Sequence, residues 1–216
     1  TLLPKAWDIV AGVMHLYKRL SPGEGVELLV LDFADAFYML PLVDEEKRYV
    51  AAYFSGSFYL WGCIAQGSLN GPTAFGRPSA LTARMTQSLY PDSHLQLQVY
   101  ADDLCAAIRG TPRRIKVMST VPALCWRALV WNLSYHKGQL GKMVDWIGFS
   151  IQITPPEVIA KIKEDSMGEV STWTDQLLSQ SQATTQDVRS YAGKANHVAT
   201  FVHTRRPFLD HFWAIK

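Results

Sequence analysis

The sequence predicts an α+β domain with a mostly antiparallel sheet, followed by a smaller segment made only of helices. Two hairpin signals, at residues 49–64 and 95–108, predict antiparallel pairing because each joins two apolar runs through a short turn. Beyond Pro155-Pro156 the chain is polar with helical spacing, which predicts helices only. Hydrophobic residues make up 48% of the 216 positions and charged residues 19%, the composition of a globular protein.

The expected elements follow one another without an internal repeat. Apolar residues at helical spacing predict a helix over residues 5–20, and Ser21-Pro22-Gly23 ends it. A continuous apolar run over residues 26–33 predicts a strand buried on both faces. The elements expected next are a hairpin of strands 49–54 and 58–64, a helix 72–89, a hairpin of strands 95–100 and 104–108, a helix 112–131, strand structure within 143–153, and helices on either side of a polar joint at 179–185.

The bulk properties exclude several classes of protein. No apolar run reaches the roughly 18 to 20 residues needed to span a bilayer, so no membrane partner is expected. Three cysteines without a C-x-x-C pair argue against a disulfide framework or a zinc knuckle, and favour a reducing, intracellular setting. The net charge of +2 is too small to indicate nucleic-acid binding by itself. A first residue other than Met favours a piece of a longer protein.

Two carboxylate sites stand out. Asp32 ends the apolar strand 26–33, where a charged side chain is costly unless it is paired or bound to a metal. Asp102 and Asp103 are adjacent at the tip of the second hairpin, where their negative charges repel each other. A hard divalent cation such as Mg²⁺ usually offsets this repulsion. If the strands are neighbours, the three carboxylates converge and can hold two metal ions for an in-line phosphoryl displacement.

The Asp-Asp pair alone is a weak signal. Twelve aspartates in 216 residues give one adjacent pair by chance roughly half the time. An isolated Asp-Asp turn is more often a solvated hairpin tip than a metal site. The hypothesis of a metal site therefore depends on the other motifs in the chain.

Those motifs resemble the conserved boxes of reverse transcriptases. Residues 100–103, Y-A-D-D, resemble the Y-x-D-D box, and residues 32–42, D-F-A-D-A-F-Y-M-L-P-L, resemble the first catalytic box, 70 positions upstream. Residues 65–75, A-Q-G-S-L-N-G-P-T-A-F, are similar to the segment L-P-Q-G-x-x-x-S-P-x-x-F, with Ala65 in place of Pro and Gly71 in place of Ser. Because both departures lie in the segment that faces template and nucleotide, they bear on fidelity or activity.

Further boxes follow in the family's order. Residues 133–137, L-S-Y-H-K, resemble the loop with the family's conserved lysine, and residues 146–149, W-I-G-F, resemble the primer-grip hairpin. Residues 189–194 and 205–209 are similar to thumb helices of long-terminal-repeat or tyrosine-recombinase-type retrotransposons. The resemblance implies a right-hand polymerase palm with a remnant of the fingers over residues 1–154, and a helical thumb or connection segment over residues 155–216.

The resemblance implies RNA-directed DNA polymerase activity with two Mg²⁺ ions, for which Mn²⁺ can substitute. Asp32 and Asp102 would be the main metal ligands, and Asp103 would complete the carboxylate cluster. The implied nucleotide-binding residues are Asp35 and Ala36 through their amides, Phe37 as a steric gate against the ribose 2′-hydroxyl, Gln66 and Gly67 beside the nascent base pair, and Lys137 as proton donor to pyrophosphate. The implied primer and template contacts are Tyr100, Trp146 and Gly148.

Plain structural interpretations stay open for most of these positions. Asp35 can be the N-cap of the turn after the strand, and Gly67 can be required by backbone conformation alone. Tyr100 can be an ordinary half-buried strand residue, and Trp146 a core residue between palm and thumb. Phe37 would be read as a core residue outside this box.

The implied partners are an RNA template, a DNA primer, deoxynucleoside triphosphates and the rest of a polyprotein. The family's fingers would lie upstream of Thr1, and a ribonuclease H domain can follow. The site of action would be the cytoplasm or the nucleus. One alternative is an inactive relic or a domesticated RNA-binding module on the same scaffold. Another is an RNA-dependent RNA polymerase, disfavoured by Ala101 and Phe37, or a palm-like nucleotide cyclase, disfavoured by the segment 66–75 and the helical tail.

Overall fold

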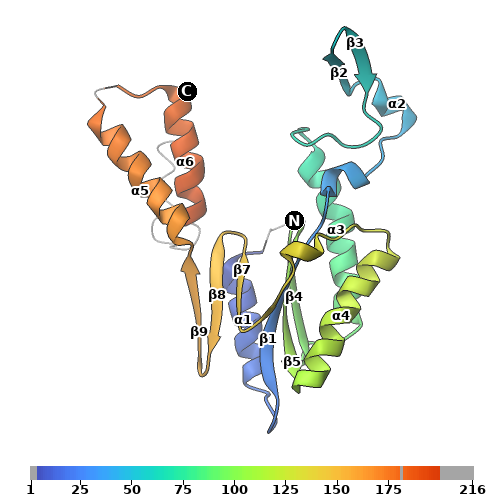
Figure 1. Cartoon of the computed structure of the whole chain (residues 1–216), viewed down its shortest axis with the longest axis vertical. Helices are drawn as coiled ribbons and strands as arrows, with labels where there is room; N and C mark the ends of the chain where they lie inside the picture. The colour runs from blue at the N-terminus through green and yellow to red at the C-terminus, as the bar shows by residue number, and fades with distance from the viewer. Residues whose placement is uncertain (1–3, 181, 200–216) are drawn as a thin grey trace.

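A four-stranded antiparallel sheet forms the centre of the computed structural model, which describes residues 4–180 and 182–199 (Figure 1). Its strands lie in the order β4 (Leu95–Tyr100), β5 (Asp103–Gly110), β1 (Gly25–Asp32) and β6 (Gln139–Gly141). The pairing of β5 with β1 and β4 is antiparallel throughout, as the hairpin signals predict. The short strand β6 was not predicted.

Strand β1 is buried on both faces, which confirms the prediction from its continuous apolar run. Val26, Leu28 and Val30 face a core shared with helix α1 (Ala6–Tyr17) and with a second sheet. Leu29 and Leu31 face the opposite core, which contains residues of α3 (Gly71–Ser88) and α4 (Pro112–Ala128). Since side chains alternate along a strand, a central strand covered by helices on both faces must be apolar at nearly every position.

The second sheet corrects one prediction. It consists of β7 (Met143–Trp146), β8 (Phe149–Thr154) and β9 (Glu157–Ile162), so the expectation of helices only beyond Pro155-Pro156 is wrong for residues 157–162. The two prolines form the turn between β8 and β9, whose register pairs Thr154 with Glu157. The predicted boundary between the palm (1–154) and the helical segment (155–216) therefore falls inside the β8–β9 hairpin. The division into these two domains stays a prediction.

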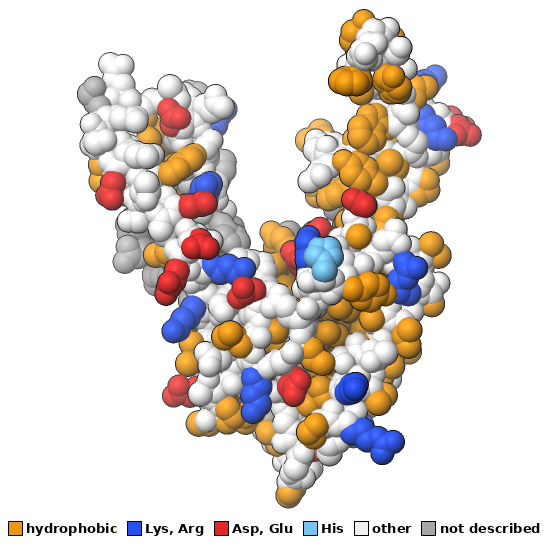
Figure 2. Space-filling view, in the orientation of Figure 1, with side chains coloured by type: hydrophobic (Ala, Val, Ile, Leu, Met, Phe, Trp, Pro, Cys, Tyr) orange, Lys and Arg blue, Asp and Glu red, His pale blue; other side chains and the backbone are white. Residues whose placement is uncertain are grey.

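Two arms, one following β9 of the second sheet and the other following β1 of the central sheet, leave a hollow between them (Figures 1 and 2). One arm consists of α5 (Glu164–Ser179) and α6 (Thr185–Ala199), on either side of the predicted polar joint. The other carries η1 (Ala36–Met39), α2 (Asp44–Lys47), and the hairpin of β2 (Ala51–Phe54) and β3 (Ser57–Leu60). The predicted thumb box at 205–209 lies outside the described residues.

None of the helices in the two described ranges is long and apolar enough to cross a bilayer. The helix predicted over residues 112–131 ends at Ala128, and the one predicted over 72–89 begins one residue earlier, at Gly71. These shifts of a few residues at helix ends are ordinary, because the end of a helix depends on tertiary contacts.

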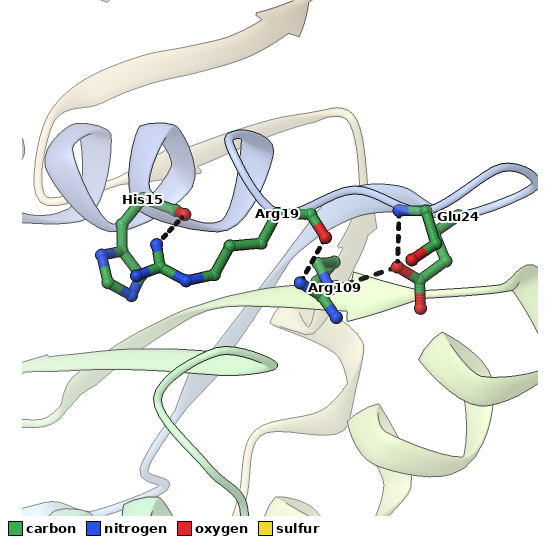
Figure 3. A network of polar contacts seen from close by, with 5 residues as sticks. His15, Arg19, Glu24 and Arg109 are labelled. Atoms are coloured by element: carbon green, nitrogen blue, oxygen red, sulfur yellow. Dashed lines mark hydrogen bonds and ion pairs between the residues drawn. The ribbon is translucent and has the colours of Figure 1, made fainter.

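An ion pair fastens the end of the sheet that lies away from the carboxylates (Figure 3). Arg109 Nε lies 3.3 Å from Glu24 Oε2, and each side chain is only 11% exposed. The Nε–H makes no aligned hydrogen bond, so the contact is mainly Coulombic. Arg109 Nη1 donates to the Arg19 carbonyl at 2.6 Å, and Glu24 Oε2 accepts from the Ser21 amide at 3.1 Å. The pair thus joins strand β5 to the loop between α1 and β1.

Replacing Arg109 by Leu is expected to lower the free energy of unfolding by about 3 kcal/mol, because Glu24 would keep a poorly solvated charge without a partner. The measurement is urea unfolding of the full chain followed by circular dichroism. The control is Lys163→Leu, which removes an ion pair to Asp145 whose side chains are 41% and 46% exposed. An exposed pair contributes at most about 1 kcal/mol. Equal losses in the two variants would contradict a stabilising role for the Glu24–Arg109 pair.

Candidate active site

The end of β1 and the β4–β5 turn bring the predicted carboxylates to one edge of the central sheet. Asp32 is the last residue of β1 and lies opposite Asp103 in the antiparallel register. Tyr100 pairs with Asp103, so Ala101 and Asp102 form the turn between β4 and β5. The strands that carry Asp32 and Asp103 are thus neighbours, which was the condition for the carboxylates to converge.

An aromatic cluster supports this edge from below. Phe33, directly after Asp32, is 3% exposed and stacks on Trp126 with ring centroids 4.4 Å apart. It also contacts Phe75 edge-on at 5.8 Å and Trp131 at 4.8 Å. Such packing fixes the backbone at the point where β1 ends, and so fixes the position of Asp32.

A cleft of about 190 Å³ contains most of the predicted metal and nucleotide residues. They are Asp32, Asp35, Ala36, Phe37, Gln66, Asp102 and Lys137. Phe33 and Tyr38 also line the cleft and were not predicted to belong to a site. Tyr38 stacks on Trp61, with ring centroids 5.7 Å apart. The only feature of the sequence that could have indicated Tyr38 as a cleft residue is its position next to Phe37 in the first box.

The predicted primer-side residues lie beside a different cavity, of about 220 Å³. Tyr100 and Asp103 line it together with Ile147, in the β7–β8 turn, and with Lys5. Ile147 and Gly148 both have positive φ, +43° and +82°. A β-branched residue in this region is strained, and such outliers often mark functional sites. Of the three predicted primer contacts, Tyr100 thus borders a cavity and Gly148 belongs to the adjacent turn.

Trp146 occupies a core position. It is 2% exposed and belongs to the core between α1, the central sheet and the second sheet. Its indole Nε1–H donates to the carbonyl oxygen of Asp103 at 3.2 Å. The side chain can therefore act on a primer only indirectly, through the β7–β8 turn that follows it and through the backbone of Asp103.

The backbone after β1 turns sharply at Asp35. This residue has φ +53° and ψ +38°, and it is the N-cap position of η1, although its side chain makes no capping hydrogen bond. In the described part of the chain, the amides of Asp35 and Ala36 donate to no protein acceptor. Free amides are normal in the first turn of a helix, and they can accept an anion there. The predicted role of these amides stays a prediction.

Gly67 is exposed and has φ +90°, while a Cβ added there would meet no atom within 4 Å. The backbone conformation alone therefore requires glycine at this position. Gly71 is different, because its added Cβ would lie 3.4 Å from the Phe37 ring. A methyl group at Gly71 would therefore be in van der Waals contact with the Phe37 ring, which places this end of α3 beside the ring.

Lys137 supplies the positive charge nearest to the carboxylates. Its Nζ lies 2.6 Å from Asp32 Oδ2, with Asp32 12% exposed and Lys137 61% exposed. The hydrogen bond to Asp32, followed by the Coulombic attraction of that carboxylate, raises the pKa of Lys137. The backbone fixes this contact, since the Ser134 amide donates to the Asp32 carbonyl at 2.9 Å, shortly before η2 (Tyr135–Lys137).

The donor set fits a hard divalent cation at Asp32 and Asp102. Both offer carboxylate oxygens to one cleft, and the Lys137 ammonium occupies a cation position against Asp32. Asp103 faces the other cavity, and within residues 4–180 and 182–199 no three acidic, His or Cys side chains are already gathered as a metal site. Binding of two ions would thus require side-chain rotations, above all of Lys137 and Asp103.

Burial raises the pKa of Asp103 to about 6, and the charges of Asp102 and Asp32 add to the effect. Burial likewise raises the pKa of Asp102, with Asp32 contributing. An acid whose pKa is higher in the folded state than in the unfolded state stabilises the fold only at low pH. For Asp103 this contribution is complete below pH 3.8 and is lost as the pH rises to about 6.

Asp103→Asn is therefore expected to stabilise the metal-free fold near neutral pH, by on the order of 1 kcal/mol once partial exposure is allowed for. The measurement is urea unfolding in EDTA between pH 4 and 8 for both proteins. The stability difference should grow from pH 4 to 6 and then stay constant. A difference that does not change with pH would show that the ionisation of Asp103 costs the fold nothing.

Neither a protein-family model nor a curated protein matches the sequence. Solved structures do match. The structure of the foamy viral protease–reverse transcriptase with an RNA/DNA hybrid superposes with a TM-score of 0.58 and 18% identity, covering 94% of this chain and 26% of that one. A form of that enzyme termed dRH, in complex with double-stranded DNA, gives a TM-score of 0.60 and 18% identity, covering 88% of this chain and 31% of that one.

A further structure of the foamy viral enzyme, in complex with double-stranded DNA, gives a TM-score of 0.56 and 20% identity over 79% of this chain and 32% of that one. The chain thus spans about a quarter to a third of the length of the proteins it matches. At this level of identity the similarity establishes the fold. The chain has the α+β fold of a reverse-transcriptase palm, with the antiparallel sheet packed on helices.

Proposed function

We propose that this chain is the palm and thumb part of an RNA-directed DNA polymerase, belonging to a retroelement polyprotein. The observation that carries the proposal is the cleft at the end of β1, where Asp32 and Asp102 lie together with Phe37 and Gln66 on a reverse-transcriptase palm fold. Two carboxylates, an aromatic ring and an amide side chain in one cleft form a binding site for a nucleoside triphosphate with its metal ions.

In this proposal Asp32 and Asp102 hold two Mg²⁺ ions, and Asp103 joins them after rotating toward the cleft. The ions would lower the pKa of the primer 3′-hydroxyl and neutralise charge on the triphosphate and leaving pyrophosphate. Lys137, once released from Asp32, lies within the same cleft and can donate a proton to pyrophosphate. The amides of Asp35 and Ala36 would contact the triphosphate, and Gln66 with Gly67 would border the base pair.

The hollow between the two arms (Figure 2) is the proposed place for the template and primer. The three foamy viral structures are complexes with an RNA/DNA hybrid or double-stranded DNA, which supports an RNA template and a DNA primer here. Tyr100 and the Ile147–Gly148 turn border the cavity on the far side of Asp103, and we assign the primer end to that cavity. The boxes at 189–194 and 205–209 favour a long-terminal-repeat or tyrosine-recombinase-type retrotransposon as the source.

The test is primer extension on poly(rA)–oligo(dT) with dTTP and Mg²⁺. Because the chain spans only about a quarter to a third of the length of the similar proteins, the assay uses the chain together with the coding sequence on either side of it. Extension by the parent and none by Asp102→Asn is the expected result. A parent that binds template–primer without extending it would support the alternative of an inactive RNA-binding relic. Equal extension by both proteins would mean that Asp102 holds no essential metal ion.

A further inference from the structure

The turn that carries Asp102 contains an unfavourable backbone conformation. Ala101, between Tyr100 and Asp102, has φ +53°. This left-handed region is easily reached by glycine and disfavoured for alanine, whose Cβ crowds the next carbonyl. A two-residue turn with such a residue at its first position persists only where the surrounding structure holds it. What holds this turn also decides where the carboxylates of Asp102 and Asp103 point.

Three hydrogen bonds from three different elements hold three successive carbonyls of the turn. Ser79 Oγ, in α3, donates to the Ala101 carbonyl at 2.6 Å. The Phe33 amide, just after β1, donates to the Asp102 carbonyl at 3.3 Å. The third donor is the β7 indole that bonds the Asp103 carbonyl at 3.2 Å. The shortest of the three therefore reaches the one residue with left-handed backbone geometry.

Ser79 is unusual for a serine inside a helix. A serine or threonine in that position normally bonds the carbonyl four residues earlier, as Thr86 of the same helix does to Thr82 at 2.9 Å. Ser79 instead donates to a residue 22 positions further along the chain. Its side chain is 1% exposed, so no water competes for the contact. Helix α3 thus gives a buried hydroxyl to the turn that carries the two aspartates.

We propose that Ser79 is a positioning residue for the carboxylate site. By fixing the Ala101 carbonyl, its hydroxyl holds Ala101 in the left-handed conformation. It thereby keeps the Asp102 carboxylate in the cleft shared with Asp32 and fixes where β5 begins at Asp103. Ser79 itself touches neither metal nor nucleotide. The metal-binding part of this inference rests on the proposed function, whereas the positioning of the turn follows from the hydrogen bonds alone.

The test compares Ser79→Ala with Thr82→Val in the full chain. Thr82 is a matched control, since it lies one turn further along α3, is 4% exposed, and accepts a hydrogen bond from Trp131 Nε1 at 2.9 Å. Both variants remove one buried hydroxyl from the same helix. The first readout is Mn²⁺ affinity by electron paramagnetic resonance. The second is amide hydrogen exchange in a peptide covering residues 98–105, without metal.

Ser79→Ala is expected to weaken Mn²⁺ binding about tenfold, the usual effect of removing a group that orients metal ligands, and to speed exchange in the turn peptide. Thr82→Val should leave both within about twofold of the parent. An Mn²⁺ affinity unchanged by Ser79→Ala, or weakened equally by Thr82→Val, would overturn the inference. A parent that binds no Mn²⁺ would overturn the proposed metal site, and the exchange readout would then decide the positioning role alone.

Discussion

Asp32→Asn is expected to lower the rate of primer extension by about 10³-fold or more, because a metal ligand contributes several kcal/mol to stabilising the transition state. Asparagine keeps the shape of the side chain and removes its charge. The charge is the feature that matters, since Asp32 is the buried member of the pair with Lys137 and shares the cleft with Asp102. The measurement is single-turnover extension at saturating dTTP and Mg²⁺.

The control for this variant is Asp35→Asn. Asp35 lines the same cleft and is exposed, but its proposed contact with the nucleotide is through the backbone amide. Asparagine also tolerates the left-handed conformation that this residue adopts, so the turn should persist. We expect extension within about threefold of the parent for Asp35→Asn. Similar large losses in both variants would show that the assay responds to any change of charge in the cleft.

A loss of folding cannot account for the expected effect of Asp32→Asn. The ion pair to Lys137 involves a partner that is 61% exposed, and such pairs contribute at most about 1 kcal/mol. The aromatic packing beneath Phe33 does not depend on the carboxylate. Urea unfolding of the variant should therefore match that of the parent to within about 1 kcal/mol.

The local pattern of the sequence was enough to place Asp32 at the end of a strand and Asp102 in a hairpin turn, but not to show that the two strands pair. The apolar run that ends at Asp32 predicts a central strand, and the hairpin signal around Asp102 predicts a turn. The structure supplies the missing step, because antiparallel pairing of β1 with β5 puts the end of one beside the tip of the other. These features are local and periodic, so they can be read without knowing the fold. The other residues of the cleft were predicted only from the resemblance to reverse-transcriptase boxes, because the hydrophobic periodicity of the sequence does not indicate them.

The contacts that complete the site could not be predicted, because they join residues far apart in the chain. Ser79 reads as an ordinary helix serine until the partner 22 residues away is known. The pairing of Lys137 with Asp32 spans 105 residues. Strand β9 was missed for a different reason. The two prolines before it were read as a domain boundary, although they form a hairpin turn and the alternation of Val158, Ala160 and Ile162 is typical of a strand.

The carboxylate site needs these long-range contacts because its negative charges lie close together. Asp32, Asp102 and Asp103 all lie at one sheet edge, with Lys137 as the cation that neutralises part of their charge. Burial is the main reason why the pKa of Asp103 is raised to about 6, and the repulsion from Asp102 and Asp32 adds to it. The fold must therefore hold the three carboxylates close together although burial and mutual repulsion disfavour their charged forms. The packing under Phe33 and the hydrogen bonds to the turn provide that support.

Phe37→Ala is expected to reduce discrimination against ribonucleotides by on the order of 10²-fold, because a ring that excludes a hydroxyl by its volume gives selectivity of about that size. The ring lies in the cleft with Asp32 and Gln66 and packs on Phe75 with centroids 5.3 Å apart. Gly71 lies one turn before Phe75 on the same helix, and a Cβ added there would be 3.4 Å from the Phe37 ring. Helix α3 thus supports the ring within the cleft, at a position where it can exclude a 2′-hydroxyl by its volume.

The measurement is the ratio of kcat/KM for dTTP to that for UTP on poly(rA)–oligo(dT), with Tyr38→Ala as the neighbouring aromatic control. Tyr38 also lines the cleft but is 42% exposed and packs on Trp61, so its removal should leave the ratio within about threefold. Any loss of folded protein in Phe37→Ala cancels, because both substrates are measured on one preparation. An unchanged ratio in Phe37→Ala would mean that the ring belongs to the core alone and that another group selects the sugar.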